Sequence, residues 1–538
     1  MKARQQAGTW DAEADVLIVG FGAAGACAAL EAAGHGATVL IVDRFHGGGS
    51  TAASGGVVYA GGGTPHQEEA GYDDAPEQMA RYLKREVNGA VSEETLRRFC
   101  EGSRDDLRWL EELGVPFDAS LCPYKTSYPR DGYYLYFSGN EQVSEYRNHA
   151  KPAPRGHRTR GRGISGLAFF GALERAVRAR GIQVRAQTQV QRLVLSAVGT
   201  VVGVEGRSIP PGSVWAAIHS RLSWINAKAP TYVPPLSRWI TALLARITER
   251  HSQPFRARGR RGVVLTAGGF VFNAAMVREH APLYLRCRPL GTVADDGAGI
   301  RLGQSAGGAT SHMHRLSGWR FYVPPEALTH GVLVNRQGQR ICNEELYGAT
   351  VADRMAAHGG EAWLVFDRNT YRLAVHMLPR QAALWQMLAM VPMLLLGRSR
   401  AASVPALAAK IGVDAAGLQS TLEAYNHTAK SGLPDPLGKA PEHSIPQETP
   451  PFYAVDCSFS AVHGVPCAAM TLGGLVVDET TGQVLREDGT AIAGLYAAGR
   501  NAAGLCAEAY VSGLSLADCV FSGRRAGRQA ATSPAPGP

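Results

Sequence analysis

The chain has 538 residues, of which 45% are hydrophobic and 63 are glycine, so a disordered or fibrous protein is excluded and two or three domains are expected. The net charge of +9 would suit a nucleic-acid-binding protein. However, ten Lys or Arg and a single acid, Glu249, fall between Arg207 and Arg261, so the rest of the chain is close to neutral. A local basic segment is therefore predicted, and nucleic acid is not expected as a partner.

Several other classes of protein are excluded by missing motifs. The nine cysteines form no CxxC pair, and the sixteen histidines show no HExxH or paired His–Cys spacing, so no metal site is expected. A GxSxG elbow of a serine hydrolase is absent too. The first fourteen residues lack the apolar core of a signal peptide, which predicts a cytoplasmic protein with reduced thiols.

Residues 15–43 predict a strand, a tight turn, a helix and a second strand. Gly20 and Gly22 let the backbone turn and approach a pyrophosphate, while Gly25 lets the helix pack closely on the strand. Asp43 ends the second strand, where a carboxylate accepts hydrogen bonds from ribose hydroxyls. Two strands and a terminal acid around the glycines predict a Rossmann-like dinucleotide site.

Glycine-rich stretches at both ends of the chain extend this site. A loop over 44–56 follows the second strand, and strands end in small residues near 267 and 499. One nucleotide unit with contacts from several places favours FAD over NAD, because a flavin is held between domains. The residues predicted to bind FAD are Gly20, Gly22, Ala23, Ala24, Gly25, Asp43, Arg44, Ser50, Thr51, Ser54, Gly55, Gly56, Ala267, Gly268, Asp296, Gly499, Ser515 and Leu516.

The middle of the chain reads as a separate domain. Residues 281–445 mix short strands and helices and contain no second strand-GxGxxG-helix unit. We therefore expect an α/β protein in which an α+β substrate domain, 281–445, is inserted between two parts of a FAD-binding domain, 1–280 and 446–538. The aromatic stretch 125–146 receives no predicted role, because such density more often reflects packing.

The segment 205–261 interrupts the nucleotide domain. It contains Trp215 and Trp224, and its helical spacing predicts one apolar face beside basic side chains. This pattern fits a helix lying in a membrane interface, but a helix packed on the protein core fits equally well. The predicted apolar face comprises Trp239, Ile240, Leu243, Leu244 and Ile247, and the basic residues are Arg238, Arg246 and Arg250.

A second apolar segment, 382–396, is bounded by Arg380 and Arg398 and contains Pro392. It is shorter than the roughly 20 residues that span a bilayer. We therefore expect peripheral contact with the inner face of the membrane through 205–261, with 382–396 as a second candidate contact, and no spanning helix.

Taken together, the glycine motifs, Thr471-Leu-Gly-Gly474 and Gly494 to Arg500 resemble the flavoprotein superfamily of fumarate reductases and 3-ketosteroid dehydrogenases. The resemblance covers nearly the whole chain except 205–261 and the apolar run near 390. It implies a glutathione-reductase-type FAD-binding domain with an inserted substrate domain. Succinate dehydrogenases attach FAD through a histidine whose place is taken here by Gly49, which implies noncovalent FAD.

The region Ala507 to Gly513 is similar to the 3-oxo-5α-steroid 4-dehydrogenases, which have a tyrosine and a serine two residues apart, as in Tyr510 and Ser512. Δ1-dehydrogenases carry Tyr-Pro-Gly instead. Tyr322 appears in the place of the family's second catalytic phenol. The resemblance implies that Tyr510 polarises the C3 carbonyl, Tyr322 removes the C4 proton and Ser512 relays it, although the two tyrosines could exchange roles.

The implied reaction converts a 3-oxo-5α-steroid to a 3-oxo-4-ene, with hydride leaving C5 for the flavin and electrons passing to a quinone or another external acceptor. Because a ketone α-proton is weakly acidic, we expect carbonyl polarisation together with a lowered phenol pKa. Two alternatives stay open: a 3-ketosteroid Δ1-dehydrogenase, and a membrane-bound flavoprotein that only carries electrons.

Overall fold

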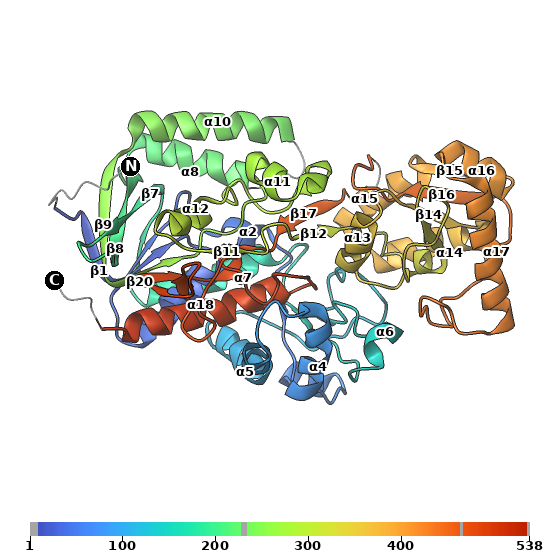
Figure 1. Cartoon of the computed structure of the whole chain (residues 1–538), viewed down its shortest axis with the longest axis horizontal. Helices are drawn as coiled ribbons and strands as arrows, with labels where there is room; N and C mark the ends of the chain where they lie inside the picture. The colour runs from blue at the N-terminus through green and yellow to red at the C-terminus, as the bar shows by residue number, and fades with distance from the viewer. Residues whose placement is uncertain (1–8, 228–233, 463–465, 535–538) are drawn as a thin grey trace.

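The computed structural model describes residues 9–227, 234–462 and 466–534. Two predictions fall partly outside the described residues. They are the membrane-contacting segment, at residues 228–233, and the absence of a signal peptide, at residues 1–8. Figure 1 shows two bodies side by side, one built on the sheet that contains β1 and β9 and the other on helices α13 to α17, with β12 and β17 between them.

The larger body contains an eight-stranded sheet in the order β19-β20-β9-β1-β2-β6, with β8 pairing β9 and β7 pairing β8. β1 pairs in parallel with both β2 and β9, and β20 pairs in parallel with β9. The predicted parallel α/β nucleotide fold is therefore confirmed. The strands are β1 (Ala12–Val19), β2 (Val39–Val42), β6 (Gln183–Arg185), β7 (Thr188–Leu195), β8 (Val201–Ser208), β9 (Gln253–Leu265), β19 (Gln483–Leu485) and β20 (Ala491–Ala497).

Helix α1 (Ala23–Gly34) packs against the C-terminal helix α18 (Leu514–Thr532) through small residues. A Cβ atom on Gly527 would lie 2.2 Å from the carbonyl oxygen of Ala28, and one on Gly523 would lie 2.6 Å from that of Ala24. The alanine-rich sequence of α1 thus lets two helices and the sheet approach closely, and it fixes α18 next to the nucleotide motif.

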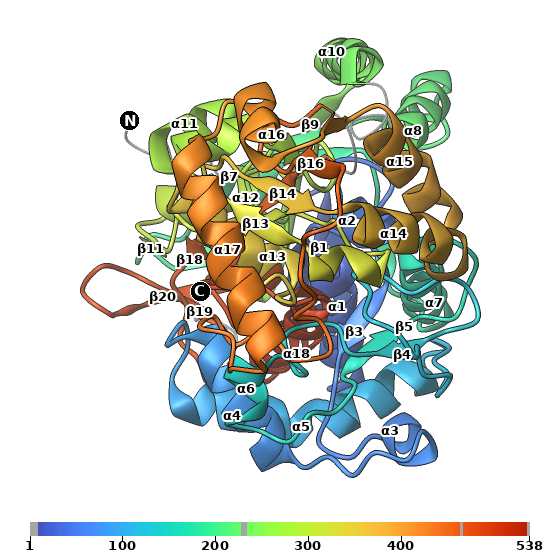
Figure 2. The same cartoon turned by 90° about the vertical axis from the view of Figure 1, so that its right-hand side faces the viewer.

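Smaller elements cover the other side of α18. Figure 1 shows helices α4 and α5 here. A three-stranded sheet in the order β3-β5-β4, labelled in Figure 2, contacts α18 through β3. These elements are β3 (Val57–Tyr59), α3 (Pro65–Glu69), α4 (Pro76–Val87), α5 (Glu93–Glu112), β4 (Leu135–Tyr136), α6 (Ser144–Arg147) and β5 (Gly156–Arg158). Helix α7 (Gly166–Ala179) instead packs on α1 and on α2 (Gly49–Ala53).

The second body is built on an antiparallel sheet in the order β13-β14-β16-β15. β16 belongs to this sheet although it follows residue 445, where the sequence placed the end of the substrate domain. Its elements are β13 (Val332–Val334), α13 (Gly348–Ala356), β14 (Trp363–Phe366), α14 (Arg368–Gln381), α15 (Leu384–Leu395), β15 (Arg398–Ala401), α16 (Val404–Ile411), α17 (Ala415–Ser431) and β16 (Phe452–Asp456).

Short strands join the two bodies. β17 pairs with β10 in parallel and with β12 antiparallel, and β11 pairs with β18. These connecting elements and their flanking helices are α11 (Ala274–His280), η1 (Pro282–Arg286), β10 (Arg288–Pro289), α12 (Ala298–Ser305), β11 (Thr310–Ser311), β12 (Leu316–Trp319), η2 (Glu326–His330), β17 (Ala468–Thr471), β18 (Gly474–Leu475) and η3 (Gly499–Asn501).

The basic segment forms two helices, α8 (Val214–Asn226) and α10 (Pro234–His251), between β8 and β9. The five residues predicted to share one apolar face do not share one environment. Ile240, Leu244 and Ile247 are buried, whereas Trp239 is 62% exposed. Core packing therefore explains most of this apolar stripe, because Ile247 and Leu243 pack on residues of α8 and on Ile209.

No helix within the described ranges is long and apolar enough to cross a membrane. Helix α15 instead buries Met390 and Met393 on one side and leaves Leu384 and Leu388 exposed on the other, at 78% and 72%.

We predict that Gly25→Ala disrupts the nucleotide motif, because the added Cβ would lie 2.0 Å from the carbonyl oxygen of Gly20. Backbone atoms of the turn cannot move away without distorting it, so we expect the free energy of unfolding to fall by at least about 2 kcal/mol. We also expect the variant to lose most of its bound flavin. Thermal midpoint and flavin absorbance per protein measure both effects.

Gly34→Ala is the matched control, since no heavy atom lies within 4 Å of its added Cβ at the end of the same helix. We expect a change below about 1 kcal/mol there. Equal flavin content in the two variants would contradict the packing described for Gly25.

Candidate active site

The turn between β1 and α1 is shaped by Asp43. Its carboxylate accepts hydrogen bonds from the amides of Phe21 and Phe45, each at 2.8 Å. Gly22 caps α1 without a side-chain hydrogen bond, and Thr51 Oγ1 accepts the Ala23 amide at 2.9 Å. Asp43 and the helix N-terminus therefore lie together at the carboxyl end of the parallel strands, where nucleotides bind in such sheets.

A buried ion pair joins residues from three distant parts of the chain. Arg500 Nη2 lies 2.9 Å from Asp295 Oδ1, and the Ser50 hydroxyl also donates to Asp295. A Cβ on Gly268 would lie only 2.2 Å from the same carboxylate. The sequence selected the neighbouring Asp296, which instead pairs with Arg44 at 2.7 Å in a more exposed position. Asp295 is thus the acid that organises this part of the site.

Three polar atoms around this ion pair are buried and have no hydrogen-bond partner among the described residues: Arg500 Nη1, Asn501 Nδ2 and Thr292 Oγ1. Asn501 also accepts the Ala267 amide at 3.1 Å through its Oδ1 atom. Because buried donors are normally satisfied, this group suits a ligand that brings several acceptor atoms. The residues present therefore fit a flavin nucleotide.

Other predicted cofactor residues hold the surrounding loops. Ser54 Oγ donates to the Thr51 carbonyl at 2.7 Å and accepts the Gly56 amide at 3.1 Å. The Gly55 carbonyl accepts the Tyr128 hydroxyl at 3.0 Å. Gly499 donates its amide to Ser522 on α18, whose first turn carries Ser515 and Leu516.

Tyr510 and Ser512 lie in the loop that precedes α18. The Tyr510 ring stacks on Trp319, with ring centroids 5.1 Å apart and an interplanar angle of 16°. Ser512 Oγ shares a 3.0 Å hydrogen bond with the Tyr136 hydroxyl, and the Ser512 carbonyl accepts from Ser138 Oγ at 3.0 Å. The loop is therefore fixed between β12 and β4.

Tyr347 is a second phenol at this place. Its amide donates to Asn140 Oδ1 at 2.6 Å, and its ring lies 5.8 Å from the Phe321 ring. Burial raises the pKa of Tyr347, as do the nearby Tyr510 and Tyr136 phenols, while a hydrogen bond with Ser512 lowers it. Tyr136, Tyr347, Tyr510 and Ser512 thus form one cluster, which we call the tyrosine cluster.

Tyr322 lies elsewhere. Its hydroxyl donates to the Glu344 carbonyl at 2.9 Å, and burial raises its pKa well above the usual value for tyrosine. Successive side chains of an extended segment point to opposite sides, so Trp319 and Phe321 reach the tyrosine cluster while Tyr322 points away. The structure therefore does not bring Tyr322 together with Tyr510 and Ser512, and its role as the base stays a prediction.

The protonation of these phenols also differs from the sequence-based expectation. Burial raises the pKa of both Tyr510 and Tyr136, although the nearby Arg500 lowers that of Tyr510 and the Ser512 hydrogen bond lowers that of Tyr136. The prediction of a lowered phenol pKa was wrong, because desolvation disfavours the phenolate more than these partners favour it. The phenols are neutral hydrogen-bond donors at neutral pH.

Comparison with known proteins decides the family. The family described as FAD binding domain matches residues 15–513. The chain belongs to this FAD-binding family. Its cofactor is FAD, as the single nucleotide unit with glycine-rich contacts at both ends of the chain predicted.

Two relatives cover nearly all of this flavoprotein. It is 40% identical over 504 residues to a 3-oxo-5-alpha-steroid 4-dehydrogenase of Comamonas testosteroni, covering 91% of this chain and 93% of the relative. The crystal structure of a 3-ketosteroid-delta4-(5alpha)-dehydrogenase from Rhodococcus jostii RHA1, in complex with 4-androstene-3,17-dione, has a TM-score of 0.82 at 31% identity and 98% coverage of both chains.

A 3-ketosteroid delta1-dehydrogenase from Sterolibacterium denitrificans shares the fold, with a TM-score of 0.66 at 21% identity, over 96% of this chain and 99% of that one.

The described part of the flavoprotein contains no group of three His, Cys, Asp or Glu side chains arranged to hold a metal ion.

Sequence reasoning missed Asp295, Trp319 and Tyr347. Tyr136 lies in the aromatic stretch 125–146, so the tyrosine density there was a signal that could have found it. Tyr347 stands in no recognisable motif, and only tertiary packing brings it to Ser512.

Proposed function

We propose that this flavoprotein is a dehydrogenase that converts 3-oxo-5α-steroids to 3-oxo-4-ene steroids. The observation that carries the proposal is the tyrosine cluster, with Tyr510 and Ser512 two residues apart, in a chain 40% identical to a named 3-oxo-5-alpha-steroid 4-dehydrogenase. FAD, bound noncovalently beside Asp43 and the Asp295–Arg500 pair, supplies a hydride acceptor.

The neutral phenol of Tyr510 donates a hydrogen bond to the C3 carbonyl, which makes the C4 proton more acidic. Tyr347 takes the place first given to Tyr322: its own proton leaves through Ser512 Oγ, the relay, and the phenolate oxygen of Tyr347 then accepts the C4 proton. Ser512 Oγ, which is hydrogen-bonded to Tyr136 at 3.0 Å, supports the charge on Tyr347. Trp319 and Phe321 give the flat apolar walls that a steroid ring system needs and that exclude water.

The same residues separate the alternatives. A Δ1-dehydrogenase would carry proline after the tyrosine, where this chain has Val511. A protein that only carries electrons would need neither Ser512 nor a second phenol beside Tyr510.

We predict that anaerobic mixing with 5α-androstane-3,17-dione bleaches the flavin and forms an enone with the new double bond at C4–C5. Flavin absorbance and product mass spectrometry with NMR measure the two halves of the reaction. Exclusive desaturation at C1–C2 would establish the Δ1 alternative instead.

We predict different effects for two tyrosine variants. Tyr347→Phe should lower the rate of flavin reduction by substrate at least about 100-fold, because a positioned acid or base contributes this much. Tyr322→Phe should lose only the hydrogen bond to the Glu344 carbonyl, at about 1 kcal/mol of stability, with flavin reduction within about threefold of wild type.

Stopped-flow flavin absorbance distinguishes these outcomes, and thermal midpoints show whether each variant is folded. If Tyr322→Phe is the slow variant and Tyr347→Phe is not, the roles proposed here are exchanged. Wild-type flavin reduction in the double variant Tyr510→Phe and Tyr347→Phe would favour the electron carrier.

We propose further that the protein contacts the inner face of a membrane and passes electrons to a quinone or another external acceptor. Trp224 and Trp239 are 63% and 62% exposed on the basic helices, and Leu384 and Leu388 are exposed on α15. Figures 1 and 2 place α8, α10 and α15 on the same side of the molecule. Exposed tryptophan beside arginine suits an anionic lipid surface.

We predict that the protein sediments with vesicles containing phosphatidylglycerol at low salt. The quadruple variant with Trp224, Trp239, Leu384 and Leu388 changed to Ser should bind at least about tenfold more weakly. The control Leu433→Ser removes an exposed leucine that follows α17 and should bind as wild type. Equal sedimentation of all three proteins would rule out this surface as the contact.

A further inference from the structure

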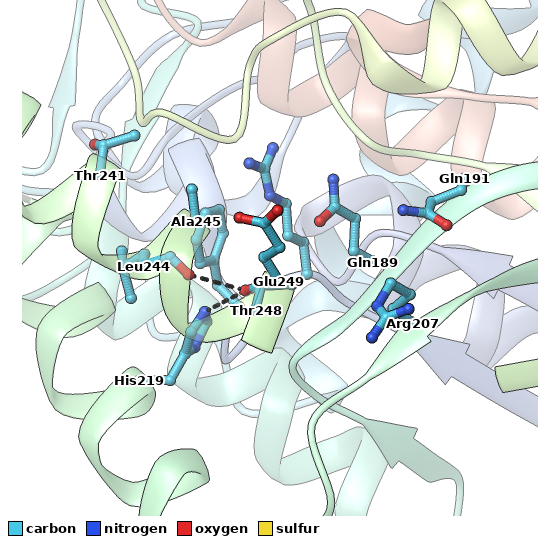
Figure 3. Close-up of a pocket in the computed structure, with 11 residues that line it drawn as sticks. Gln189, Gln191, Arg207, His219, Thr241, Leu244, Ala245, Thr248 and Glu249 are labelled. Carbon is cyan, nitrogen blue, oxygen red and sulfur yellow. Dashed lines mark hydrogen bonds between the residues drawn. The ribbon is translucent and has the colours of Figure 1, made fainter. Parts of the chain in front are cut away.

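A pocket of about 300 Å³ lies between helices α8 and α10 and the large sheet. Figure 3 shows Gln189 and Gln191 of β7 on one side of it and Thr241, Ala245 and Thr248 of α10 on the other. Arg44 and Phe45, which directly follow Asp43, also line this pocket. The pocket therefore begins next to the acid expected to hold the ribose of the nucleotide.

The two helices are fastened to the loop that follows β2. Ser223 of α8 lies 3.0 Å from His46 Nδ1, and the His219 ring stacks on Phe45 with centroids 6.0 Å apart. Gln187, whose amide donates to the Phe45 carbonyl at 2.8 Å, also donates its side-chain Nε2 to the Ala216 carbonyl at 2.6 Å. The helices thus form a cover over the loop beside Asp43.

Such a cover is not needed to join β8 and β9. These strands are antiparallel neighbours that a turn of about two to five residues could connect, whereas here the connection runs from Ser208 to Gln253. Ile209, Ala216 and Ile247 bury each other beneath α8 and α10, which holds the two helices in place. Because this long segment packs on the loop that follows Asp43, we infer that it acts at that loop.

The pocket lining suits a flat heterocycle. The Arg44 guanidinium lies over the Phe45 ring at 5.2 Å, and the glutamine amides of β7 offer both donors and acceptors. His219 Nε2 lies 3.5 Å from Thr248 Oγ1, and His219 Nδ1 is buried with no hydrogen-bond partner among the described residues. Burial lowers the pKa of His219 to about 4, so the imidazole is neutral at neutral pH and Nδ1 takes part in no ion pair.

We propose that helices α8 and α10 close over the adenine end of FAD, with the base in this pocket. Retention of FAD then depends on a segment whose outer face also carries the exposed tryptophans. The inference rests on FAD as the cofactor, and it goes beyond the steroid chemistry, which concerns the other end of the cofactor site.

The α10 helix offers a matched pair of positions for a test. Ala245 and Ala242 are both exposed on this helix, but only Ala245 lines the pocket. Ala245→Phe should weaken FAD binding at least about tenfold because the larger side chain fills the space for the base, and Ala242→Phe should stay within twofold of wild type. The free FAD fraction after dilution of the holoprotein, measured by fluorescence, gives both dissociation constants.

A smaller substitution guards against misfolding of the first variant. Ala245→Cys should react with N-ethylmaleimide slowly in the FAD-loaded protein and at least about tenfold faster after FAD removal, whereas Ala242→Cys should react equally in both states. Peptide mass spectrometry assigns the labelled cysteine among the nine native ones.

Equal labelling of Ala245→Cys with and without FAD would overturn the proposal. The proposal would also be overturned if Ala245→Cys in the FAD-loaded protein were protected from N-ethylmaleimide only after AMP is added. The pocket would then bind a second nucleotide and not the adenine of FAD. These readouts follow FAD and not steroid turnover, so a failure here is distinguishable from a failure of the proposed dehydrogenase activity.

Discussion

The close approach of the first strand and helix to the rest of the large sheet is the constraint on which the other parts depend. A Cβ on Gly20 would lie 2.6 Å from the carbonyl oxygen of Thr266, and Thr266 Oγ1 donates to the Gly20 carbonyl at 2.8 Å. The turn that receives the nucleotide is thus pressed against the end of β9. Helix α1 leaves this turn and packs on α18, whose preceding loop carries Tyr510 and Ser512. The nucleotide motif and the tyrosine cluster are therefore parts of one rigid arrangement.

Burial sets the chemistry of the tyrosine cluster. Desolvation keeps Tyr136, Tyr347 and Tyr510 protonated, so each is a hydrogen-bond donor before it is a base. An apolar ketone matches such a site better than a dicarboxylate, because neutral phenols offer no charge to balance a second anion. For a phenol to accept a proton here, its anion must be stabilised by the hydrogen bonds around Ser512.

The two apolar segments, 205–261 and 382–396, have separate structural roles. Helix α15 packs Trp385 against Tyr128, in the aromatic cluster that also contains Tyr136, so its inner side borders the candidate site. Helices α8 and α10 lie at the other end, over the loop that follows Asp43. Both segments present exposed apolar side chains outward, which would place the two ends of the site near one surface.

The sequence by itself determined the nucleotide fold, because glycines, flanking strands and a terminal acid act over short distances along the chain. Through the resemblance of Ala507 to Gly513 to the steroid dehydrogenases, it also predicted Tyr510 and Ser512 as site residues. Only tertiary structure decided that Asp295, and not Asp296, pairs with Arg500, because neighbouring side chains point in different directions. Tyr322 likewise points to the Glu344 carbonyl and not to the tyrosine cluster. Tyr347 reaches Ser512 only because the two domains pack together, and no local sequence pattern indicates this contact.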